Sequence, residues 1–399
     1  VDGVLRLDDT VSGHAPELAA LDRFDSAPIT IRDLLAMTCG LPSDDPWADR
    51  HLDMTDEHFD RIITDGPLFA HPTGNEFEYS NFGYAVLGRV VRRASGRRLQ
   101  DLVSERLLRP LGLRSTTWTR PDHDDWARPT RWVDDAGDGH HEPESEPLGD
   151  GAIAPMGGLW TTLRDLATWV TWLDDAFPAR NEPDDGPLGR ASRREMQTAQ
   201  RYIGHRTVAG VRTAHGYGFG LVTVDDPDLG RGITHSGGLP GYGSNMRWLP
   251  GRRVGVIALA NVTYAPMLEL TARLLSLVAD QGLVPPDRPG VTADVDASAH
   301  RLVALLNNWD DGDAVELFTG SLLLDDPLER RAAAARRFTA DRSPLTIAAI
   351  EAAGAAAATV RCTCQSGEGD SVSFHLAPRR PPQIQSYSLT VDDPAATDD

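Results

Sequence analysis

The 399-residue sequence contains no lysine, so all 39 of its basic residues are arginines. Arginine stays protonated in proteins, and a lysine-free chain therefore has no side-chain amine that could act as a general base. The 59 acidic residues outnumber the basic ones and give a formal net charge of −20 at pH 7. A negative charge this large argues against a nucleic-acid backbone or an anionic membrane as a partner.

Cysteine and long apolar runs are scarce as well. The three cysteines, Cys39, Cys362 and Cys364, cannot form a disulfide framework. Cys362 and Cys364 lie two residues apart on a predicted strand and point to one face, with no further metal ligands nearby, so we expect buried thiols and no metal site. The best apolar run, residues 254–260, is strand-sized, whereas a membrane-spanning helix needs about 20 residues. We therefore predict no membrane span.

The most informative stretch is residues 78–84, Glu-Tyr-Ser-Asn-Phe-Gly-Tyr. It joins an irregular loop to a predicted helix whose apolar residues recur at helical spacing, at Phe82, Ala85, Val86 and Val90. Asn81 is the expected N-cap, and Gly96 fits the position just past the last turn. Because a polar triplet at a helix start is held in place, Tyr79 and Asn81 could present a phenol and an amide at one point. The alternative is a tyrosine that only packs and an asparagine that only caps.

Three further motifs stand in a fixed order around this stretch. Residues 30–42 read Thr-Ile-Arg-Asp-Leu-Leu-Ala-Met-Thr-Cys-Gly-Leu-Pro, residues 155–162 read Pro-Met-Gly-Gly-Leu-Trp-Thr-Thr, and residues 235–241 read His-Ser-Gly-Gly-Leu-Pro-Gly. Together with Tyr-Ser-Asn they resemble the serine hydrolases related to class C β-lactamases, D-alanyl-D-alanine carboxypeptidases and the esterases of that fold. Each motif alone is weak, and it is their order, over roughly the first 280 residues, that makes the resemblance specific.

The resemblance implies an α/β (α+β) fold for residues 1–284, with an antiparallel sheet flanked by helices and an all-helical lobe. Three strand-like runs, 232–235, 243–249 and 253–260, agree with it because the short turns between them favour an antiparallel meander. We predict a linker over 285–296, a small C-terminal α+β domain over 297–391 and a disordered tail over 392–399. In that domain helices precede four strands, an order similar to the NTF2-like fold.

The resemblance also assigns roles to matching residues. Tyr79 matches the tyrosine that relays a proton, and His235 stands where lysine is commoner, as in many esterase-like members. The residues implied to hold the substrate are Asn81, Ser236, Gly237 and Gly238, the last through a backbone N–H that donates to the oxyanion. The implied partner is a small-molecule or peptide acyl substrate, such as a β-lactam, a D-alanyl peptide or a short ester. No cofactor and no metal are implied.

The nucleophile is missing from this set. In the resembled family a serine and a lysine lie one turn apart in a Ser-x-x-Lys motif on a central helix. Residues 1–11 resemble the loop after that helix, so we expect the helix upstream of Val1, an N-terminally truncated chain, and no activity from residues 1–399 alone. A lone tyrosine, with a pKa near 10, is ionised in roughly one molecule in a thousand at pH 7. Cys39 could replace the serine, but we expect it to be a buried thiol.

Two other functions stay open. The chain could be a degenerate, non-catalytic homologue that binds a peptide or acyl ligand. An upstream reading frame with Ser-x-x-Lys would favour the enzyme, and a start codon close to Val1 would favour the binding protein. Residues 290–399 could instead serve an interaction. No G-x-S-x-G or H-E-x-x-H motif supports an α/β-hydrolase or a zinc enzyme. The natural substrate, the compartment and the oligomeric state are not determined by the sequence.

Two glycine- or histidine-containing segments invite other interpretations. Residues 122–151 are predicted to form a solvated acidic loop, in which the adjacent His140, His141 and Glu142 diverge instead of binding a metal. Residues 216–220, Gly-Tyr-Gly-Phe-Gly, lack the strand-to-helix setting of a nucleotide-binding fingerprint. We predict a glycine-laced sheet strand there, where a small residue lets another backbone approach.

Overall fold

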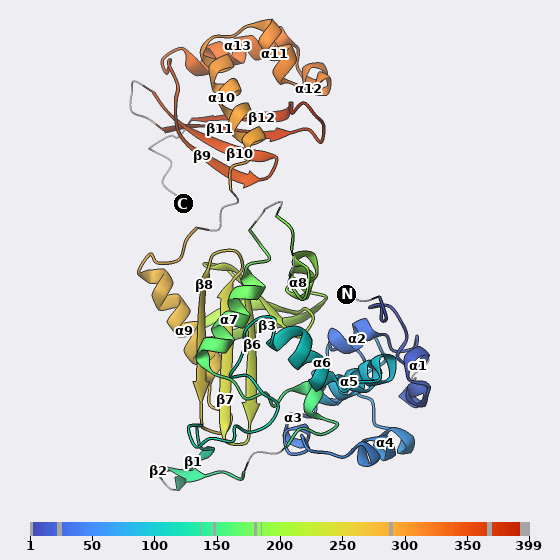
Figure 1. Ribbon diagram of the computed structural model, residues 1–399. Helices are drawn as coiled ribbons and strands as arrows, with labels where there is room; N and C mark the ends of the chain where they lie inside the picture. Colours follow the sequence, from blue (N-terminus) through green and yellow to red (C-terminus); the bar gives the residue numbers. More distant parts are fainter. Residues whose placement is uncertain are drawn as a thin grey trace. The chain divides into compact units, whose positions relative to one another are not determined.

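The computed structural model describes residues 3–21, 26–135, 137–146, 149–178, 182–184, 186–286, 290–364 and 369–391. It divides the chain into two compact units, Val1–Pro285 and Pro286–Asp399. The first unit contains a lobe of helices and a six-stranded sheet, and the second contains helices and a four-stranded sheet (Figure 1). The predicted mixed class, with antiparallel sheets and flanking helices, is confirmed. The predicted tail, residues 392–399, lies outside the described residues.

The helical lobe is built around α5, Asn81–Ser95. Its apolar side is buried against the neighbouring helices, as the helical spacing of its sequence predicts. Ser80 is the N-cap, because its hydroxyl accepts from the backbone N–H of Gly83 at 3.2 Å, so the prediction that Asn81 caps the helix is wrong by one residue. The surrounding elements are α1 (Val11–His14), η1 (Pro16–Leu21), α2 (Ile31–Leu35), α3 (Asp45–Ala48), α4 (Asp56–Asp65), α6 (Leu99–Val103) and the π-helical turn η2 (Ser104–Leu108).

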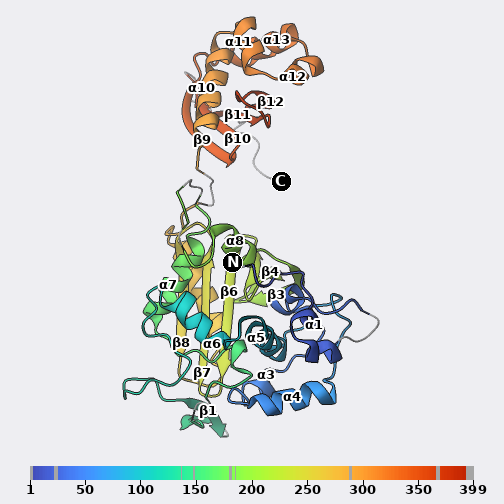
Figure 2. The ribbon, with the colours of Figure 1, turned by 45° about the vertical axis from the view of Figure 1, so that its right-hand side comes forward.

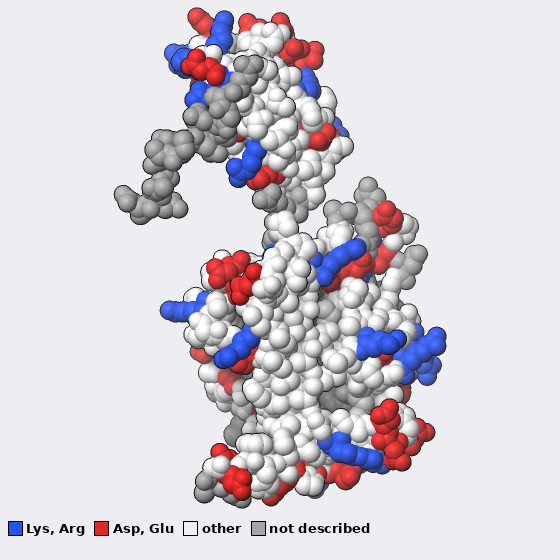
Figure 3. Space-filling view, turned by 90° about the vertical axis from the view of Figure 1, so that its left-hand side faces the viewer, with Lys and Arg blue, Asp and Glu red and all other residues white. Residues whose placement is uncertain are grey.

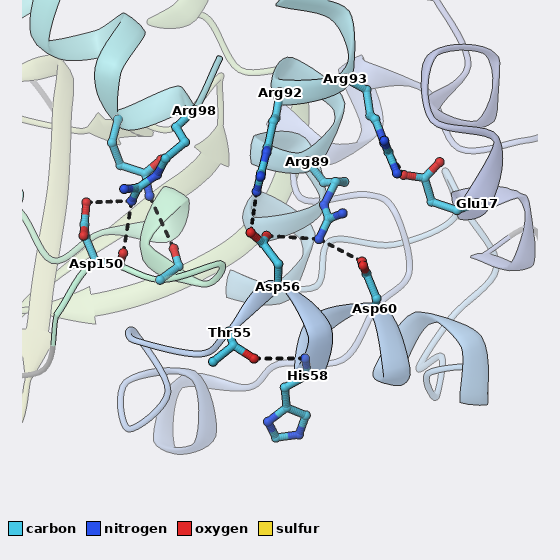
Figure 4. Close-up of polar contacts among 12 residues, drawn as sticks. Glu17, Thr55, Asp56, His58, Asp60, Arg89, Arg92, Arg93, Arg98 and Asp150 are labelled. Carbon is cyan, nitrogen blue, oxygen red and sulfur yellow. Dashed lines mark hydrogen bonds and ion pairs between the residues drawn. The ribbon is translucent and has the colours of Figure 1, made fainter. Parts of the chain in front are cut away.

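Ion pairs join α4 to α5 (Figure 4). The buried Arg89 of α5 lies 3.2 Å from Asp56 and 2.8 Å from Asp60 of α4, and Arg92 pairs with Asp56 as well. Removing both carboxylates would leave the buried charge of Arg89 uncompensated, so these contacts help to hold α4 against α5. A cavity of about 370 Å³ lies beside them, between α4, α5 and the loop that contains Pro155.

The sheet of the first unit has six antiparallel strands in the order β3-β4-β5-β6-β7-β8. Leu173 of helix α7 (Leu163–Asp174) belongs to the same buried cluster as Trp248 of β7. Thr271 of helix α9 (Met267–Asp280) donates a hydrogen bond to Asn245 of β7. Trp248 and Asn245 are three residues apart on β7, so the two helices cover opposite faces. The strands are β3 (Arg201–Val208), β4 (Val211–Tyr217), β5 (Val222–Asp226), β6 (Gly230–Leu239), β7 (Tyr242–Leu249) and β8 (Val254–Ala260).

Strand β8 lies on the side of the sheet away from the helical lobe (Figures 1 and 2). It reads Val-Gly-Val-Ile-Ala-Leu-Ala and contains no charged side chain, although charged residues commonly guard sheet edges. Few charges appear over the middle of this face of the unit (Figure 3). Its exposed leucines are Leu259 on β8 and Leu270, Leu274 and Leu277 on α9. The acidic residues are therefore spread unevenly over the surface.

The prediction of a loop over residues 122–151 is wrong in part. Strands β1 (Thr130–Asp135) and β2 (Asp138–Pro143) form an antiparallel hairpin within it. β2 is exposed along nearly its whole length, so its sequence lacks the alternation that marks a strand with one buried face. Within the described ranges, no group of three or more His, Cys, Asp or Glu side chains is placed to hold a metal ion.

The prediction of a strand over the glycine-laced residues 216–220 is right only up to Tyr217, where β4 ends. Gly216 lies in β4, and Gly218 follows the strand at a close approach of two backbones. A β-carbon on Gly218 would lie 2.1 Å from the carbonyl oxygen of Met196. A side chain is excluded at that position by the backbone next to it, and the segment has a structural role.

The second unit contains four helices and a four-stranded antiparallel sheet in the order β12-β11-β10-β9. One hydrophobic core joins the helices to the sheet, with Leu302, Phe318, Val360 and Phe374 fully buried in it. Cys362 is buried there as predicted, and Cys364 is half-buried. The elements are α10 (Ala293–Asn307), α11 (Asp311–Leu317), α12 (Gly320–Asp325), α13 (Leu328–Thr339), β9 (Thr346–Gly354), β10 (Ala357–Thr363), β11 (Gly369–Leu376) and β12 (Ile384–Val391).

Helix α12 was not predicted from the sequence, because residues 320–325 form only a short, leucine-rich segment.

Across the part of the chain that the structure describes, no helix combines the length and the apolar character needed to cross a membrane.

Gly88 offers a test of how tightly α5 is packed. A β-carbon at this position would lie 2.3 Å from Cγ and 2.7 Å from Cβ of Pro155. We expect Gly88→Ala to lower the free energy of unfolding of the first unit by roughly 1–3 kcal/mol, because overpacking forces the backbone to shift. Urea denaturation followed by tryptophan fluorescence measures the change.

Gly157→Ala is the matched control, since its φ of 169° is extended and nothing lies within 4 Å of its added β-carbon. We expect this control to change the free energy of unfolding by less than about 0.5 kcal/mol. Equal denaturation midpoints for the two variants would contradict the packing described for Gly88.

Candidate active site

The start of α5 is held by a carboxylate from the residue that precedes α3. Asp44 Oδ1 accepts from the backbone N–H of Asn81, and Asp44 Oδ2 accepts from that of Phe82, both at 2.8 Å. These N–H groups belong to the first turn of a helix and have no partner within it. A negative charge there is also favoured by the helix dipole. The turn that carries Tyr79 and Asn81 is therefore fixed by two elements at once.

On the sheet side, the site is formed by the outer half of β6. Strand β5 pairs with β6 only from Gly230 to Thr234, whereas β7 pairs with it from Ile233 to Leu239. In the described sheet, the segment from His235 to Leu239 is therefore paired along one side only. Backbone groups on its other side are available to a ligand, as at any open strand edge.

Tyr79 and His235 are brought together across the two lobes. Their ring centroids lie 6.3 Å apart, and the ring of Tyr217 lies 6.3 Å from Tyr79 and 6.4 Å from His235. The Tyr217 hydroxyl is 3.5 Å from Nε2 of His235. The three rings thus form one cluster at the junction of α5, β4 and β6.

Asn81 joins this cluster through a neighbouring carboxylate. Its Nδ2 donates to Oδ1 of Asp45 at 2.6 Å, and Asp45 acts electrostatically on both Tyr79 and His235. Asn81 is nearly fully buried, with 3% of its surface exposed. Its amide is therefore held by Asp45, the carboxylate that also acts on the two rings.

The surroundings keep both rings uncharged at pH 7. Burial raises the pKa of Tyr79, and the carboxylates of Asp45, Asp49 and Asp44 raise it further. Burial lowers the pKa of His235, an effect that its bond with the Ser236 backbone and the charge of Asp45 offset only partly. The phenol can consequently donate a proton, but it is not ionised to accept one.

Ser236, Gly237 and Gly238 do not all face the rings. Ser236 follows His235 on β6, so its side chain points to the opposite face, where its Oγ accepts from Nδ2 of Asn245 at 3.0 Å. A β-carbon on Gly237 would lie 2.5 Å from Oγ of Ser244, and one on Gly238 would lie 2.7 Å from the ring of Tyr264. A side chain at either position would need Ser244 or Tyr264 to move.

Cys39 is the buried thiol that the sequence predicts. Its exposed fraction is 1%, and burial raises its pKa to about 12. A thiol in this state carries almost no thiolate at pH 7 and is a poor nucleophile.

Sequence reasoning missed several residues of the site. The acidic segment after the 30–42 motif was given no role in the site. The missed residues are Asp44, Asp45 and Asp49 of this segment, Tyr217 of β4, and Tyr264 of the loop between β8 and α9. For the aspartates, the one signal in the sequence was a run of acidic residues next to a recognised motif. For the two tyrosines, the sequence contained no signal of a role in the site.

Asp45 is the charge that acts on both rings, so its removal tests the electrostatics. In Asp45→Asn we expect the pKa of Tyr79 to fall, because its phenolate is repelled less. We expect the pKa of His235 to fall too, because the imidazolium loses an attractive charge. NMR titration of carbon-labelled tyrosine and histidine measures both values.

Asp65→Asn, at the exposed end of α4, is the control, since Asp65 is not among the groups that act on either ring. A Tyr79 pKa that is the same in Asp45→Asn as in the parent chain would show that the described arrangement of charges is wrong.

Comparisons with known proteins show which sequences this chain is similar to. Protein flp of Staphylococcus aureus (strain MW2) is 27% identical over 279 residues, which cover 67% of this chain and 50% of that protein. The D-alanyl-D-alanine-carboxypeptidase/endopeptidase AmpH of Escherichia coli (strain K12) is 30% identical over 172 residues, 42% of each protein. The chain thus spans about half the length, or less, of these two curated relatives.

Solved structures show the same fold. The octameric penicillin-binding protein homologue from Pyrococcus abyssi superposes with a TM-score of 0.57 and 18% identity, over 98% of this chain and 80% of that one. At this level of identity the likeness concerns the fold alone. The family model described as Beta-lactamase matches residues 2–280, which is well over half of the sequence. The chain therefore belongs to the β-lactamase family.

Proposed function

We propose that the first unit forms the substrate site of a serine hydrolase that acts on an ester or amide through an acyl-enzyme. The observation that carries the proposal is the meeting of Tyr79 and His235, with ring centroids 6.3 Å apart, beside Asn81 at the start of α5. Two motifs that are distant in the sequence, residues 78–84 and 235–241, supply these residues. Membership of the β-lactamase family supports the same reaction type.

In this proposal Asn81 and Gly238 hold the substrate. An amide has two N–H donors and one carbonyl acceptor. One donor of Asn81 is used by Asp45, and the side chain also bonds to Asp44, so in this proposal the carbonyl oxygen of Asn81 accepts from an amide of the substrate. The backbone N–H of Gly238, on the half of β6 that extends past β5, donates to the acyl oxygen where negative charge develops.

Tyr79 acts as a proton donor in its neutral form. Its raised pKa keeps the phenol protonated, so Tyr79 has a proton to give to a leaving group, whereas proton abstraction would need the phenolate that the nearby carboxylates oppose. A lysine close to the phenol would reverse this balance, and residues 1–399 contain none. We therefore propose that residues 1–399 alone bind an acyl substrate but do not turn it over.

The substrate class follows from the family and from the relatives. A β-lactam or a D-alanyl peptide is supported by the family and by the carboxypeptidase activity in the name of AmpH. A short ester uses the same acyl chemistry, and a histidine at position 235 in place of lysine is the feature that favours it.

The second candidate function is a non-catalytic protein that binds a peptide or acyl ligand. It is favoured by the lack of any lysine and by the neutral state of Tyr79 and His235 at pH 7. Both candidates share the binding step, and they differ in whether a covalent acyl group ever forms.

Covalent probes test the catalytic step. Purified residues 1–399, incubated with a fluorescent penicillin or a fluorophosphonate, are expected to remain unlabelled, because no activated nucleophile faces the ring cluster. Intact-protein mass spectrometry measures the labelling. Stoichiometric labelling would contradict this expectation, and peptide mapping would then identify the nucleophile as Cys39 or a serine.

Binding tests the site itself. We expect N-acetyl-D-alaninamide to shift the NMR resonances of Tyr79, Asn81 and Gly238, and we expect Asn81→Ala to weaken binding roughly tenfold, the cost of a lost hydrogen bond. Asn75→Ala, at an exposed loop position, is the matched control. Shifts confined to another surface, or an affinity unaffected by Asn81→Ala, would contradict the proposed site.

A further inference from the structure

Tyr264 has a backbone conformation that is unusual for its residue type. It lies in the loop between β8 and α9 with a φ of 49°, in the left-handed region that side chains with a β-carbon rarely adopt. Such conformations persist only where surrounding contacts impose them, and they concentrate at functional sites. Here the backbone N–H of Tyr264 donates to the carbonyl of Tyr242 at 3.1 Å, which fixes the loop to the β6–β7 turn.

The ring of Tyr264 lies against Gly238. A β-carbon on Gly238 would be 2.7 Å from Cδ1 and 3.3 Å from Cε1 of the ring, so this position can only be glycine while the ring stays in place. Half of Tyr264 is nevertheless exposed, at 50%. One part of the Tyr264 ring therefore covers Gly238, and the exposed part of the ring faces solvent.

The hydroxyl of Tyr264 ties the ring to the helical lobe. It donates to Oδ2 of Asp49, directly after α3, at 2.8 Å, and Asp49 is buried to all but 5% of its surface. Asp49 also acts on Tyr79, so the carboxylate that accepts this bond is one of the charges that influence the ring cluster. Tyr264 thus spans from β6 of the sheet to α3 of the helical lobe.

We propose that Tyr264 is a specificity-determining residue of the acyl site, where its ring forms a wall beside Gly238 and limits the bulk of the acyl group. The inference rests on the proposed function, because Gly238 is the proposed oxyanion donor. A group bound to that N–H meets the ring next to it. Small acyl groups such as acetyl and alanyl fit beside the wall, and bulky aryl-acyl groups are excluded.

Two ligands that differ only in acyl bulk test the wall. N-acetyl-D-alaninamide and N-phenylacetyl-D-alaninamide are titrated into residues 1–399 and followed by NMR at Gly238. We expect Tyr264→Ala to improve the affinity for the phenylacetyl ligand relative to the acetyl ligand by roughly tenfold or more. Tyr264→Phe keeps the ring and should keep the preference of the parent chain. Tyr202→Ala, an exposed tyrosine on β3, is the matched control and should change nothing.

A ligand-free measurement tests the tie to Asp49. Burial raises the pKa of Asp49 to about 6, and the hydrogen bond from Tyr264 holds it below the value that burial alone would give. Carbon NMR titration of the Asp49 carboxyl should therefore give a higher pKa in Tyr264→Phe. An unchanged value would show that the hydroxyl does not reach Asp49 and that the ring does not lie where the wall requires it, which would overturn the inference.

The outcomes separate the inference from the proposed function. If neither ligand binds the parent chain, the proposed function is wrong, and the inference about Tyr264, which rests on it, is wrong as well. If both ligands bind and Tyr264→Ala leaves their affinity ratio unchanged, only the inference is overturned. A ratio that shifts in Tyr264→Ala and stays constant in Tyr264→Phe and Tyr202→Ala supports the wall.

Discussion

The carboxylate of Asp44 on the first N–H groups of α5 is the contact on which the site depends. It satisfies two donors that a helix leaves free and binds the segment before α3 to the turn that carries Tyr79 and Asn81. Burial raises the pKa of Asp44, and the two backbone N–H groups counter that rise. The carboxylate therefore depends on the helix for its charge, and the helix depends on the carboxylate for its position.

The charges around the rings set the chemistry that the site can support. Asp44, Asp45 and Asp49 all act on Tyr79, and no lysine exists in the chain to balance them. Carboxylates near a phenol oppose its ionisation, so the negative charge of the segment from Asp44 to Asp49 makes Tyr79 a proton donor. The same carboxylates disfavour a negative charge placed directly beside the rings.

The sequence was sufficient where a local rule decides the structure. Helix α5 followed from the spacing of its apolar residues, and the antiparallel meander of β6, β7 and β8 followed from short turns between strand-like runs. The N-cap was misplaced by one residue because Ser80 and Asn81 are both good caps, and only the hydrogen bond to Gly83 distinguishes them. The β1–β2 hairpin was missed because both of its faces are exposed.

Other features depend on contacts between distant segments, which composition and spacing do not contain. Nothing local in the sequence indicates that Tyr264 lies on Gly238, or that Asp49 receives its hydroxyl, since these contacts join the loop after β8 to the segment after α3. Motif order predicted that Tyr79, Asn81 and His235 belong to one site, and the geometry supports that hypothesis. The side chain of Ser236 lies on the other face of the sheet because residues alternate along a strand, a consequence that the motif alone does not reveal.

That orientation of Ser236 explains how the sheet side of the site is held. Its hydroxyl accepts from Asn245, whose Nδ2 also lies 3.1 Å from the carbonyl oxygen of His235, and Thr271 of α9 donates to Oδ1 of Asn245 at 2.6 Å. Asn245 is buried to all but 1% of its surface, where losing these bonds would leave unsatisfied polar groups. Each side of the site is thus anchored by one largely buried polar side chain, Asp44 under α5 and Asn245 behind β6. Asp44 and Asn245 both contact main-chain atoms, so the positions of the rings depend on the backbone of α5 and β6. Substitutions within the ring cluster can therefore alter its chemistry without moving these two elements.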